Sequence, residues 1–274
     1  MFDAPRISDG PSFLSLSGLA PDGAWQIDLA HDRPQHLLIW ITRGQGTALL
    51  YGARVGVGPH NALFVPARNL FALRMGPGAL GHVMAVPLPA ALPLPDGPKH
   101  LRIREVGDQR DLTAHMEAGA REQRQMDDPA QDNTLTQAAV DARAMLTAIW
   151  LARHLGTGGA PDPNPTAARH LVRAYARRIV DHYASGATMA DHAEALGVTA
   201  TYLTRTCRGE TGHTAATLLT QRLLHAACSQ LIGSDRPAQD IAAGLGFASA
   251  AYFSRFLRHH VGQSPIAFRR LHRP

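Results

Sequence analysis

The chain has 274 residues, of which 45% are hydrophobic and 18% are charged, and its formal net charge is +5. This length allows two domains with separate cores, and the composition is that of an ordinary globular protein. No apolar run approaches the roughly 18–20 residues needed to cross a bilayer, residues 1–6 lack the pattern of a secretory signal, and two cysteines fit a reducing compartment. We therefore expect a cytoplasmic protein with no membrane partner.

Residues 1–105 have the pattern of short strands separated by turns that contain glycine or proline. Strands rich in Val, Ile, Leu and aromatic residues are expected at residues 25–29, 36–43, 47–51, 53–57, 62–66, 70–75 and 82–86. Evenly spaced short strands predict an antiparallel barrel or sandwich.

Three histidines on or beside these strands, at positions 36, 60 and 82, raise the question of a metal site. The only glutamate before residue 117 is Glu105, so a ligand set of close histidines with a glutamate is missing. We expect no metal, no cofactor and no catalytic site, because no acid–base pair or nucleophile constellation is visible. The candidates to line an effector pocket are Trp25, His36, Trp40, Phe64 and His82, although aromatic residues on strands more often belong to a plain core.

The pattern becomes helical after residue 105. One polar helix is expected at residues 107–126, where Asp127-Asp128-Pro129 ends it, and a second at residues 136–155. Residues 156–165 are rich in Gly and Pro and predict an interdomain linker. The expected domains are thus residues 1–155, with a helical segment at 106–155, and residues 166–274.

The second domain contains the same phrase twice. Residues 200–205 (ATYLTR) return 50 residues later as residues 250–255 (AAYFSR). In the first copy Thr188 can cap a short helix that ends at Gly197, and Thr199 can cap a second helix. In the second copy Pro237, Gly246 and Ser249 repeat this order, so each copy predicts a helix-turn-helix.

Each second helix has an apolar and a polar face. The apolar faces are expected to contain Tyr202, Leu203, Thr206 and Cys207 in one copy, and Tyr252, Phe253, Phe256 and Leu257 in the other. The polar faces carry Thr201, Thr204, Arg205 and Arg208, and then Ala251, Ser254, Arg255 and Arg258. Arginine can fork onto a guanine edge or a phosphate, and such a face suits a major groove.

Charge and spacing agree with this reading. Residues 161–274 hold 13 arginines against 7 acidic residues, as a phosphate-binding surface requires. Residues 214–231 predict one helix about 27 Å long, at about 1.5 Å per residue. Adjacent major grooves on one side of a duplex lie about 34–36 Å apart, so we infer two groove insertions by one subunit. Cys207 and Cys228 are a redox pair or, more often in such a setting, buried free thiols.

A family resemblance makes the interpretation specific. Residues 238–258 (AxDIAxxLGFxSxxYFSRFLR) and 262–269 (GxSPxxFR) resemble the C-terminal signature of AraC-type transcription regulators. The resemblance implies two helix-turn-helix units joined by a long helix, with both recognition helices in the major groove. The implied base-facing residues are Thr201, Thr204, Arg205, Ala250, Ala251, Ser254 and Arg255, with phosphate contacts from Arg208, Arg258, Arg269 and Arg270.

The turn placement of the first half resembles the cupin-like sensor domain of the same family. It implies a small barrel with an interior effector pocket, so the expected fold class is α+β, a cupin-like antiparallel barrel with two helices followed by an all-α double helix-turn-helix. Those two helices either form a homodimer, as in many family members, or simply pack on the barrel. The implied partners are double-stranded promoter DNA, a small-molecule effector and, for an activator, RNA polymerase.

Two alternatives remain open at this point. In one, the barrel is a metal-dependent cupin enzyme fused to a DNA-binding module. In the other, DNA is bound without any effector, and activity follows the abundance of the protein.

Overall fold

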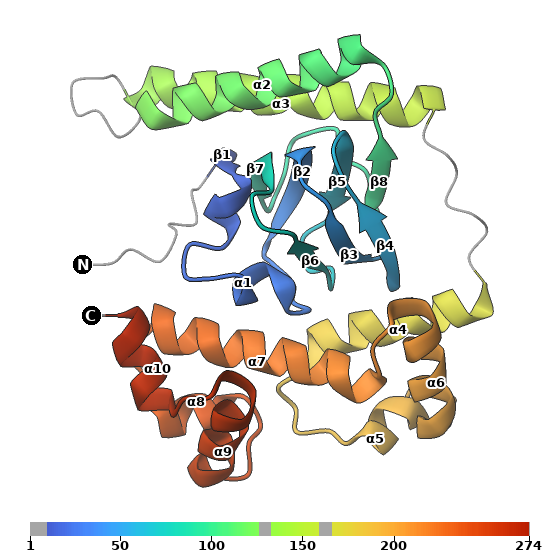
Figure 1. Cartoon of the computed structure of the whole chain (residues 1–274), viewed down its shortest axis with the longest axis vertical. Coiled ribbons are helices and arrows are strands. Elements are labelled where there is room, and N and C mark those ends of the chain that lie inside the picture. The colour runs from blue at the N-terminus through green and yellow to red at the C-terminus, as the bar shows by residue number, and fades with distance from the viewer. Residues whose placement is uncertain (1–9, 126–132, 159–165, 274) are drawn as a thin grey trace.

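The computed structural model describes residues 10–125, 133–158 and 166–273 (Figure 1). Three expectations fall outside them: the absence of a secretory signal at residues 1–6, the helix end at Asp127-Asp128-Pro129, and most of the linker, residues 159–165. The first three residues expected in the linker, 156–158, are the last turn of a helix that ends at Gly158.

The N-terminal half contains two antiparallel sheets, as the fold class predicted. The larger sheet has the order β1-β7-β2-β5-β8, and the smaller one has the order β4-β3-β6. The bounds are β1 Ser12–Ser15, β2 Gln35–Arg43, β3 Gly46–Leu50, β4 Ala53–Val57, β5 Asn61–Val65, β6 Ala72–Met75, β7 Leu80–Pro87 and β8 Lys99–Arg102.

One expected strand is wrong. Four of these residues form a helix, α1 (Trp25–Asp28), and Leu29 is its C-cap. A short 3-10 helix, η1 (Leu16–Leu19), precedes α1. The physical reason is local, because the Gln26 side chain accepts a hydrogen bond from the Asp22 backbone N–H at 2.9 Å and donates one to the Asp22 carboxylate at 3.0 Å. These bonds join residues four positions apart, so they stabilise the first turn of a helix. An extended strand would hold Asp22 and Gln26 too far apart to form them.

Both faces of the larger sheet are buried. Successive residues of a strand point to opposite faces, so Leu37, Ile39 and Ile41 of β2 fill the space between the two sheets. Leu38 and Trp40 of the same strand face the other way, into a second core formed with two helices. The larger sheet is therefore the middle layer of the N-terminal half, between the smaller sheet and the two helices.

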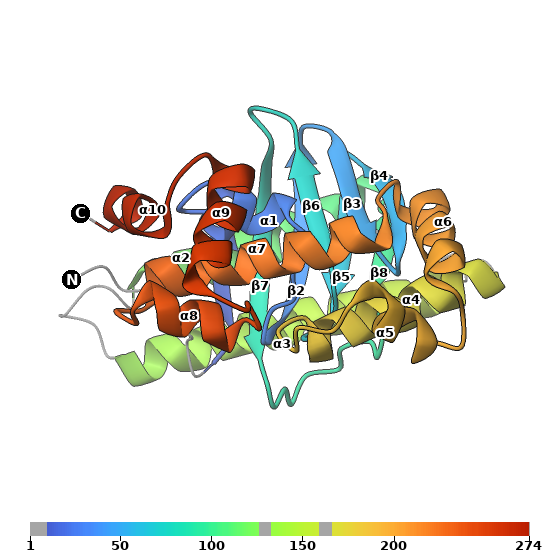
Figure 2. The same cartoon turned by 90° about the horizontal axis from the view of Figure 1, so that it is seen from below.

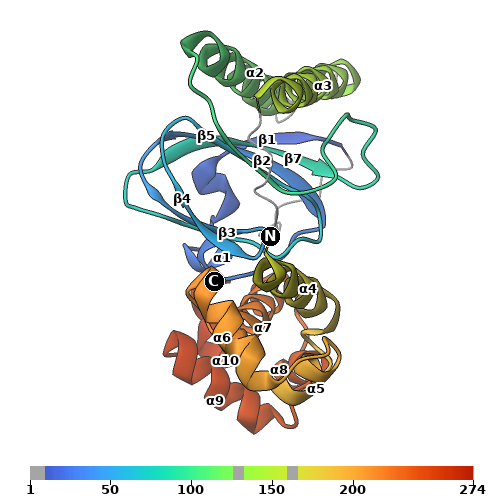
Figure 3. The ribbon, with the colours of Figure 1, turned by 90° about the vertical axis from the view of Figure 1, so that its right-hand side faces the viewer.

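Those helices are α2 (Val106–Gln125) and α3 (Asn133–Gly158), which lie together along one side of the sheets (Figures 1 and 3). Leu112 and Met116 of α2, with Val140 and Ala144 of α3, are fully buried against the sheet. The indole N–H of Trp40 donates to the hydroxyl of Thr113 at 3.0 Å. One face of α2 and one face of α3 are therefore buried against the larger sheet.

The C-terminal half is entirely helical in the described residues. Its elements are α4 Ala167–His182, α5 Met189–Glu194, α6 Ala200–Thr211, α7 Ala215–Gly233, α8 Ala238–Gly244, α9 Ala250–Val261 and α10 Pro265–His272. The caps predicted at Thr188, Thr199 and Ser249 are confirmed, since each side chain accepts a backbone N–H of the first turn. Every helix in residues 10–125, 133–158 and 166–273 is too short or too polar to cross a lipid bilayer.

Candidate nucleic-acid interface

The two sequence copies fold into two matched helix-turn-helix units, α5–α6 and α8–α9. The turn glycines Gly197 and Gly246 have φ of 68° and 76°, a region that favours glycine. The glycines that end α6 and α9, Gly212 and Gly262, have the same φ of 75°. The duplication seen in the sequence is therefore a duplication of backbone geometry.

The cores of the two units use equivalent residues. Leu203 and Cys207 of α6 are fully buried, as are Phe253 and Leu257 of α9. One expectation is corrected here, because Tyr202 and Tyr252 are exposed to 41% and 53% rather than part of the apolar faces. They occupy the second position after the first residue of each helix, where the helix turns its side chain away from the core.

The polar faces of α6 and α9 are accessible. Arg205 and Arg208 are exposed, together with Thr201, and Thr204 is partly exposed. These residues line an open depression along α6 of about 430 Å³. In α9 the exposed residues are Ala250, Ala251, Arg255 and Arg258, with Ser254 partly buried. All seven residues expected to face bases are therefore on solvent-accessible sides of the two helices.

Helix α7 connects the units. It has 19 residues, which is about 28 Å at about 1.5 Å per residue, and Figure 2 shows α6 and α9 near its opposite ends. Leu218 belongs to the core of the first unit, and Leu224 and Leu231 belong to that of the second. One helix is thus part of both cores.

The second unit also touches the turn between α4 and α5 at a glycine. A Cβ added to Gly246 would lie 2.6 Å from the carbonyl oxygen of Ala184 and 2.7 Å from the amide nitrogen of Gly186. Both atoms belong to the turn that connects α4 to α5. The turn of the second unit therefore fits against the turn between α4 and α5 only because Gly246 has no side chain.

Arg269 and Arg270, both expected to contact phosphate, have different surroundings. The guanidinium of Arg269 donates to the carbonyl of Leu231 at 3.0 Å and to the carbonyl of Arg236 at 2.5 Å. Arg269 therefore connects α10 to the end of α7 through two of its guanidinium nitrogens, and its phosphate contact stays a prediction. Arg270 is exposed, and its phosphate contact also stays a prediction.

Residues 192–271 match the family described as a helix-turn-helix domain. This segment is an AraC-type helix-turn-helix domain. The chain therefore contains a helix-turn-helix domain, a fold that binds DNA in the major groove. A search of curated protein sequences gives no match.

Several solved structures contain chains that are similar to this one. ToxT from Vibrio cholerae is 10% identical, with 96% of this chain and 97% of that chain covered and a TM-score of 0.40. The C-terminal domain of AraT, a response regulator from Geobacillus stearothermophilus, is 29% identical over 39% of this chain and 88% of that chain, with a TM-score of 0.36. A DNA-binding transcriptional dual regulator from Escherichia coli K-12 is 21% identical over 42% and 97%, with a TM-score of 0.34.

The thiols of the AraC-type domain are structural. Cys207 and Cys228 are free and buried, in the cores of different units. Burial raises the pKa of each thiol to about 12. A thiol that stays protonated is a poor nucleophile, so the interpretation as buried free thiols is the one that the structure supports.

The AraC-type domain is docked on the barrel, an arrangement that the sequence did not predict. Arg222 of α7 pairs with Asp32 of the barrel at 2.6 Å, with side chains only 10% and 15% exposed. The Arg222 guanidinium also lies 3.8 Å from the ring of Tyr183. A nearly buried ion pair across the two halves fixes their relative position, because either charge alone would be stranded in a poorly hydrated site.

A close backbone approach supports the same docking. Tyr51 and Gly52 form the two-residue turn between β3 and β4, with φ of 57° and 68°, and this turn lies on α4. A Cβ at Gly52 would lie 3.1 Å from the amide nitrogen of Arg173 and from a methyl of Val172. The Arg173 guanidinium donates to the Tyr51 carbonyl at 3.0 Å.

Four of the five effector candidates, His36, Trp40, Phe64 and His82, lie on one face of the larger sheet, and Trp25 lies apart from them. Trp25 lies on α1 and packs against Phe268 of α10, with ring centroids 6.2 Å apart. Trp40 and Phe64 are buried between the sheet and α2–α3, not in the space between the sheets. His36 stacks on Phe64 at 5.9 Å, and His82, opposite Trp40 on the neighbouring strand, is partly buried. The space between the sheets is instead filled with aliphatic side chains and Phe71.

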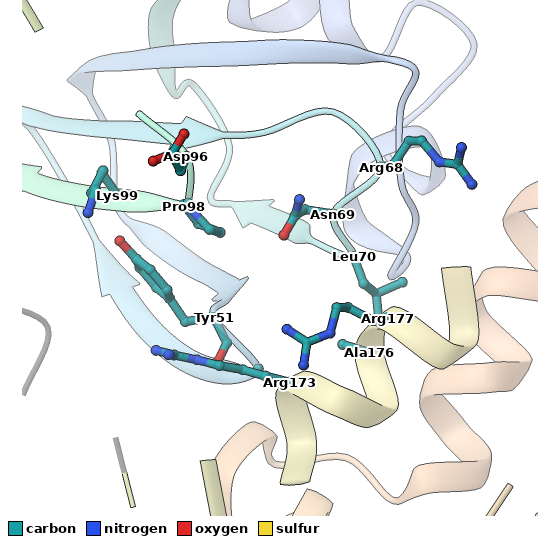
Figure 4. A pocket seen from close by; sticks show the side chains of 12 residues that line it. Tyr51, Arg68, Asn69, Leu70, Asp96, Pro98, Lys99, Arg173, Ala176 and Arg177 are labelled. Atoms are coloured by element: carbon teal, nitrogen blue, oxygen red, sulfur yellow. The ribbon is translucent and has the colours of Figure 1, made fainter. Parts of the chain in front are cut away.

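Within the part of the chain that the structure describes, no three His, Cys, Asp or Glu side chains gather closely enough to hold a metal ion. A cavity of about 440 Å³ lies instead between the barrel and α4 (Figure 4). Its lining comes from both halves and includes none of the five effector candidates. This cavity has no signal in the sequence, because it exists only when the two halves dock.

Proposed function

We propose that this protein recognises promoter DNA with two recognition helices, α6 and α9, in adjacent major grooves, and that a small molecule controls this binding. The observation that carries the proposal is the pair of matched, exposed polar faces at opposite ends of one helix. Arg205 and Arg255 occupy equivalent positions on these faces and are exposed. A bidentate arginine is the commonest specific contact to guanine in the major groove.

The two units are expected to read DNA differently. The face of α6 offers hydroxyls from Thr201 and Thr204 beside its arginines, whereas α9 begins with Ala250 and Ala251. Alanine can only contact thymine methyls or follow shape. The second half-site should therefore depend mainly on Arg255, with Ser254 as a secondary contact.

Selection of binding sites from a randomised duplex library with the full chain tests the proposal. Arg205→Ala and Arg255→Ala should each relax base preference at one position, at a cost of about 1–3 kcal/mol in discrimination. The matched control is Arg110→Ala, an exposed arginine on α2. If both reading variants keep the wild-type selected sequence and its affinity, the assignment of the base-contacting helices is wrong.

We further propose that the chain binds DNA as a homodimer through α3. Leu135, Met145 and Leu146 of this helix are exposed to 70%, 37% and 44%. With Ala138 and Ala142 they follow the spacing of one helix face, opposite the face that packs on the sheet. An apolar stripe on a surface helix favours a second copy as its cover.

Light scattering of the full chain measures the mass in solution. We expect a dimer that Leu146→Asp converts to a monomer, while Leu80→Asp, at an exposed leucine of β7, leaves it intact. A wild-type monomer at micromolar concentration would remove this part of the proposal and leave DNA reading by one subunit untouched.

A further inference from the structure

The cavity between the barrel and α4 is lined by residues with a marked charge imbalance. Tyr51, Arg68, Asn69, Leu70, Asp96, Pro98 and Lys99 come from the N-terminal half, and Arg173, Ala176 and Arg177 come from α4. Four of these side chains are cationic and one is acidic. The cavity volume of about 440 Å³ lies within the range of about 300–1,000 Å³ that is typical of small-molecule sites.

The four cations are not equivalent. Arg68 forms an ion pair with Asp181 at 3.5 Å, and Figure 4 shows its guanidinium turned away from the cavity. Arg173 lies over the Tyr51 ring, with its guanidinium carbon 5.2 Å from the ring centroid. Figure 4 shows the guanidinium of Arg177 directed towards the side of the cavity where Tyr51 lies.

Arg177 and Lys99 are the unsatisfied charges. Within the described residues, neither side chain has an ion-pair or hydrogen-bond partner, although they lie on opposite halves and line the same cavity. The acidic residue, Asp96, is exposed at the N-terminal side. Like charges that line one cavity repel each other, and an anion between them would remove that repulsion.

We propose that this cavity binds a small organic anion, whose carboxylate or phosphate group pairs with Arg177, while Lys99, beyond the Tyr51 ring in Figure 4, adds positive charge to the same cavity. The planar guanidinium of arginine matches both groups with two parallel hydrogen bonds. The ring of Tyr51 and the side chains of Leu70 and Pro98 give the rest of the ligand an apolar surface. The Asn69 amide, which Figure 4 shows at the cavity, adds a neutral hydrogen-bonding group.

The position of the cavity assigns the ligand a role in regulation. Lys99 and Tyr51 belong to the barrel half, and Arg177 belongs to the first helix of the DNA-binding half. A ligand that contacts both groups binds only when the halves are docked, so it shifts the population towards the docked arrangement. This role rests on the proposed function, whereas binding of the anion does not.

The test uses four probes on the full chain: benzoate, phenyl phosphate, benzamide and inorganic phosphate. Thermal unfolding is followed against probe concentration, since a ligand specific for the folded state raises the Tm by mass action. Benzoate or phenyl phosphate should raise the Tm with saturation, and the tighter of the two identifies the anionic group. Benzamide, the neutral analogue, should give no saturable shift, and inorganic phosphate should bind at least 10-fold more weakly than phenyl phosphate.

Variants locate the site. Arg177→Gln should weaken the binding of the better anion at least 10-fold, Lys99→Gln should weaken it by a smaller factor, and Arg110→Gln should not change it. Equal stabilisation by benzamide, unchanged binding in both cavity variants, or no saturable shift with either organic anion would each overturn the site. Affinity of wild type for its selected DNA, measured with and without the anion, reports the proposed function separately, because a chain that binds no DNA still reports the thermal shift.

Discussion

The imidazole rings of His31 and His225 stack across the contact between the two halves, with ring centroids 4.1 Å apart and an interplanar angle of 11°. His31 is fully buried. Its Nδ1 lies 2.8 Å from the Leu29 carbonyl, and its Nε2 accepts the Arg33 guanidinium N–H at 3.2 Å. His31 is therefore neutral, with its proton on Nδ1. His225 presents its Nε2 to the carbonyl of Gln26 at 3.2 Å.

The stacked pair predicts that acid weakens the folded, docked protein. Burial, and then the nearby cations, hold the pKa of His31 well below its usual value and lower that of His225 to about 3. The folded chain thus binds fewer protons than the unfolded chain, so the stabilisation is complete above about pH 6.5 and is lost as the pH falls. For His225 alone the loss between pH 7 and pH 5 should be about 2 kcal/mol.

Urea unfolding from pH 7 to pH 5 measures this dependence. His225→Phe keeps an aromatic ring at the stack but cannot be protonated, so its stability should fall less steeply than that of wild type. His170→Phe, at an exposed histidine of α4, should keep the wild-type slope. Identical slopes for all three proteins would show that the pair does not titrate as inferred.

The ion pair of Arg222 with Asp32 predicts strong coupling between the halves. Asp32→Leu alone leaves Arg222 nearly buried without its partner, and Arg222→Met alone leaves Asp32 in the same condition. Each should destabilise the full chain by about 3–5 kcal/mol, while the double variant should cost much less than the sum. A double-mutant cycle of unfolding free energies measures the coupling, and strict additivity would refute it.

The two turn glycines form a matched pair for a second stability test. Gly197→Ala places a side chain at positive φ in open space and should cost about 1–2 kcal/mol. Gly246→Ala has the same backbone problem and also meets the backbone of Ala184 and Gly186, which should add about 1–3 kcal/mol. Thermal unfolding should rank the variants in that order. Equal Tm values would mean that the second unit is not closely packed against the turn between α4 and α5.

Arg269 and Arg270 provide a test of phosphate contact at adjacent positions. Arg270→Gln should leave the Tm unchanged and lower the slope of log affinity against log salt by about 0.9, the value for one phosphate contact. Arg269→Gln should instead lower the Tm, because it removes the bonds to the carbonyls of Leu231 and Arg236. Fluorescence anisotropy over a salt series, with melting curves of both variants, separates these outcomes.

Local patterns predicted the features that depend on near neighbours in the chain. Thr188, Thr199 and Ser249 could be identified as caps because a cap acts within its own first helical turn. Residues 25–29 were assigned wrongly because a short apolar run has too few residues to distinguish a period of 3.6 from a period of 2. Tyr202 and Tyr252 were placed in the core on apolarity alone, although their hydroxyls favour a surface position.

Features made by distant residues could not be predicted. Arg222 and Asp32 are 190 positions apart, and nothing near either residue marks the other as its partner. The cavity at Arg177 and Lys99 depends on the same docking. The apolar run of β2 predicts a strand, but only the fold shows that α2 and α3 cover the face with Trp40, so that this aromatic residue belongs to a closed core.

Helix α7 has a consequence for the promoters that this protein can use. Its side chains belong to the cores of both units, and the turn at Gly246 abuts the turn that leads into the first unit. We therefore infer that no hinge lies between the two recognition helices. Two half-sites would have to keep one phase on the duplex, about 10–10.5 base pairs apart. Inserting about five base pairs, half a helical turn, between them would move the second half-site to the opposite side of the DNA. The protein could then read only one half-site, even if every base of both half-sites were correct.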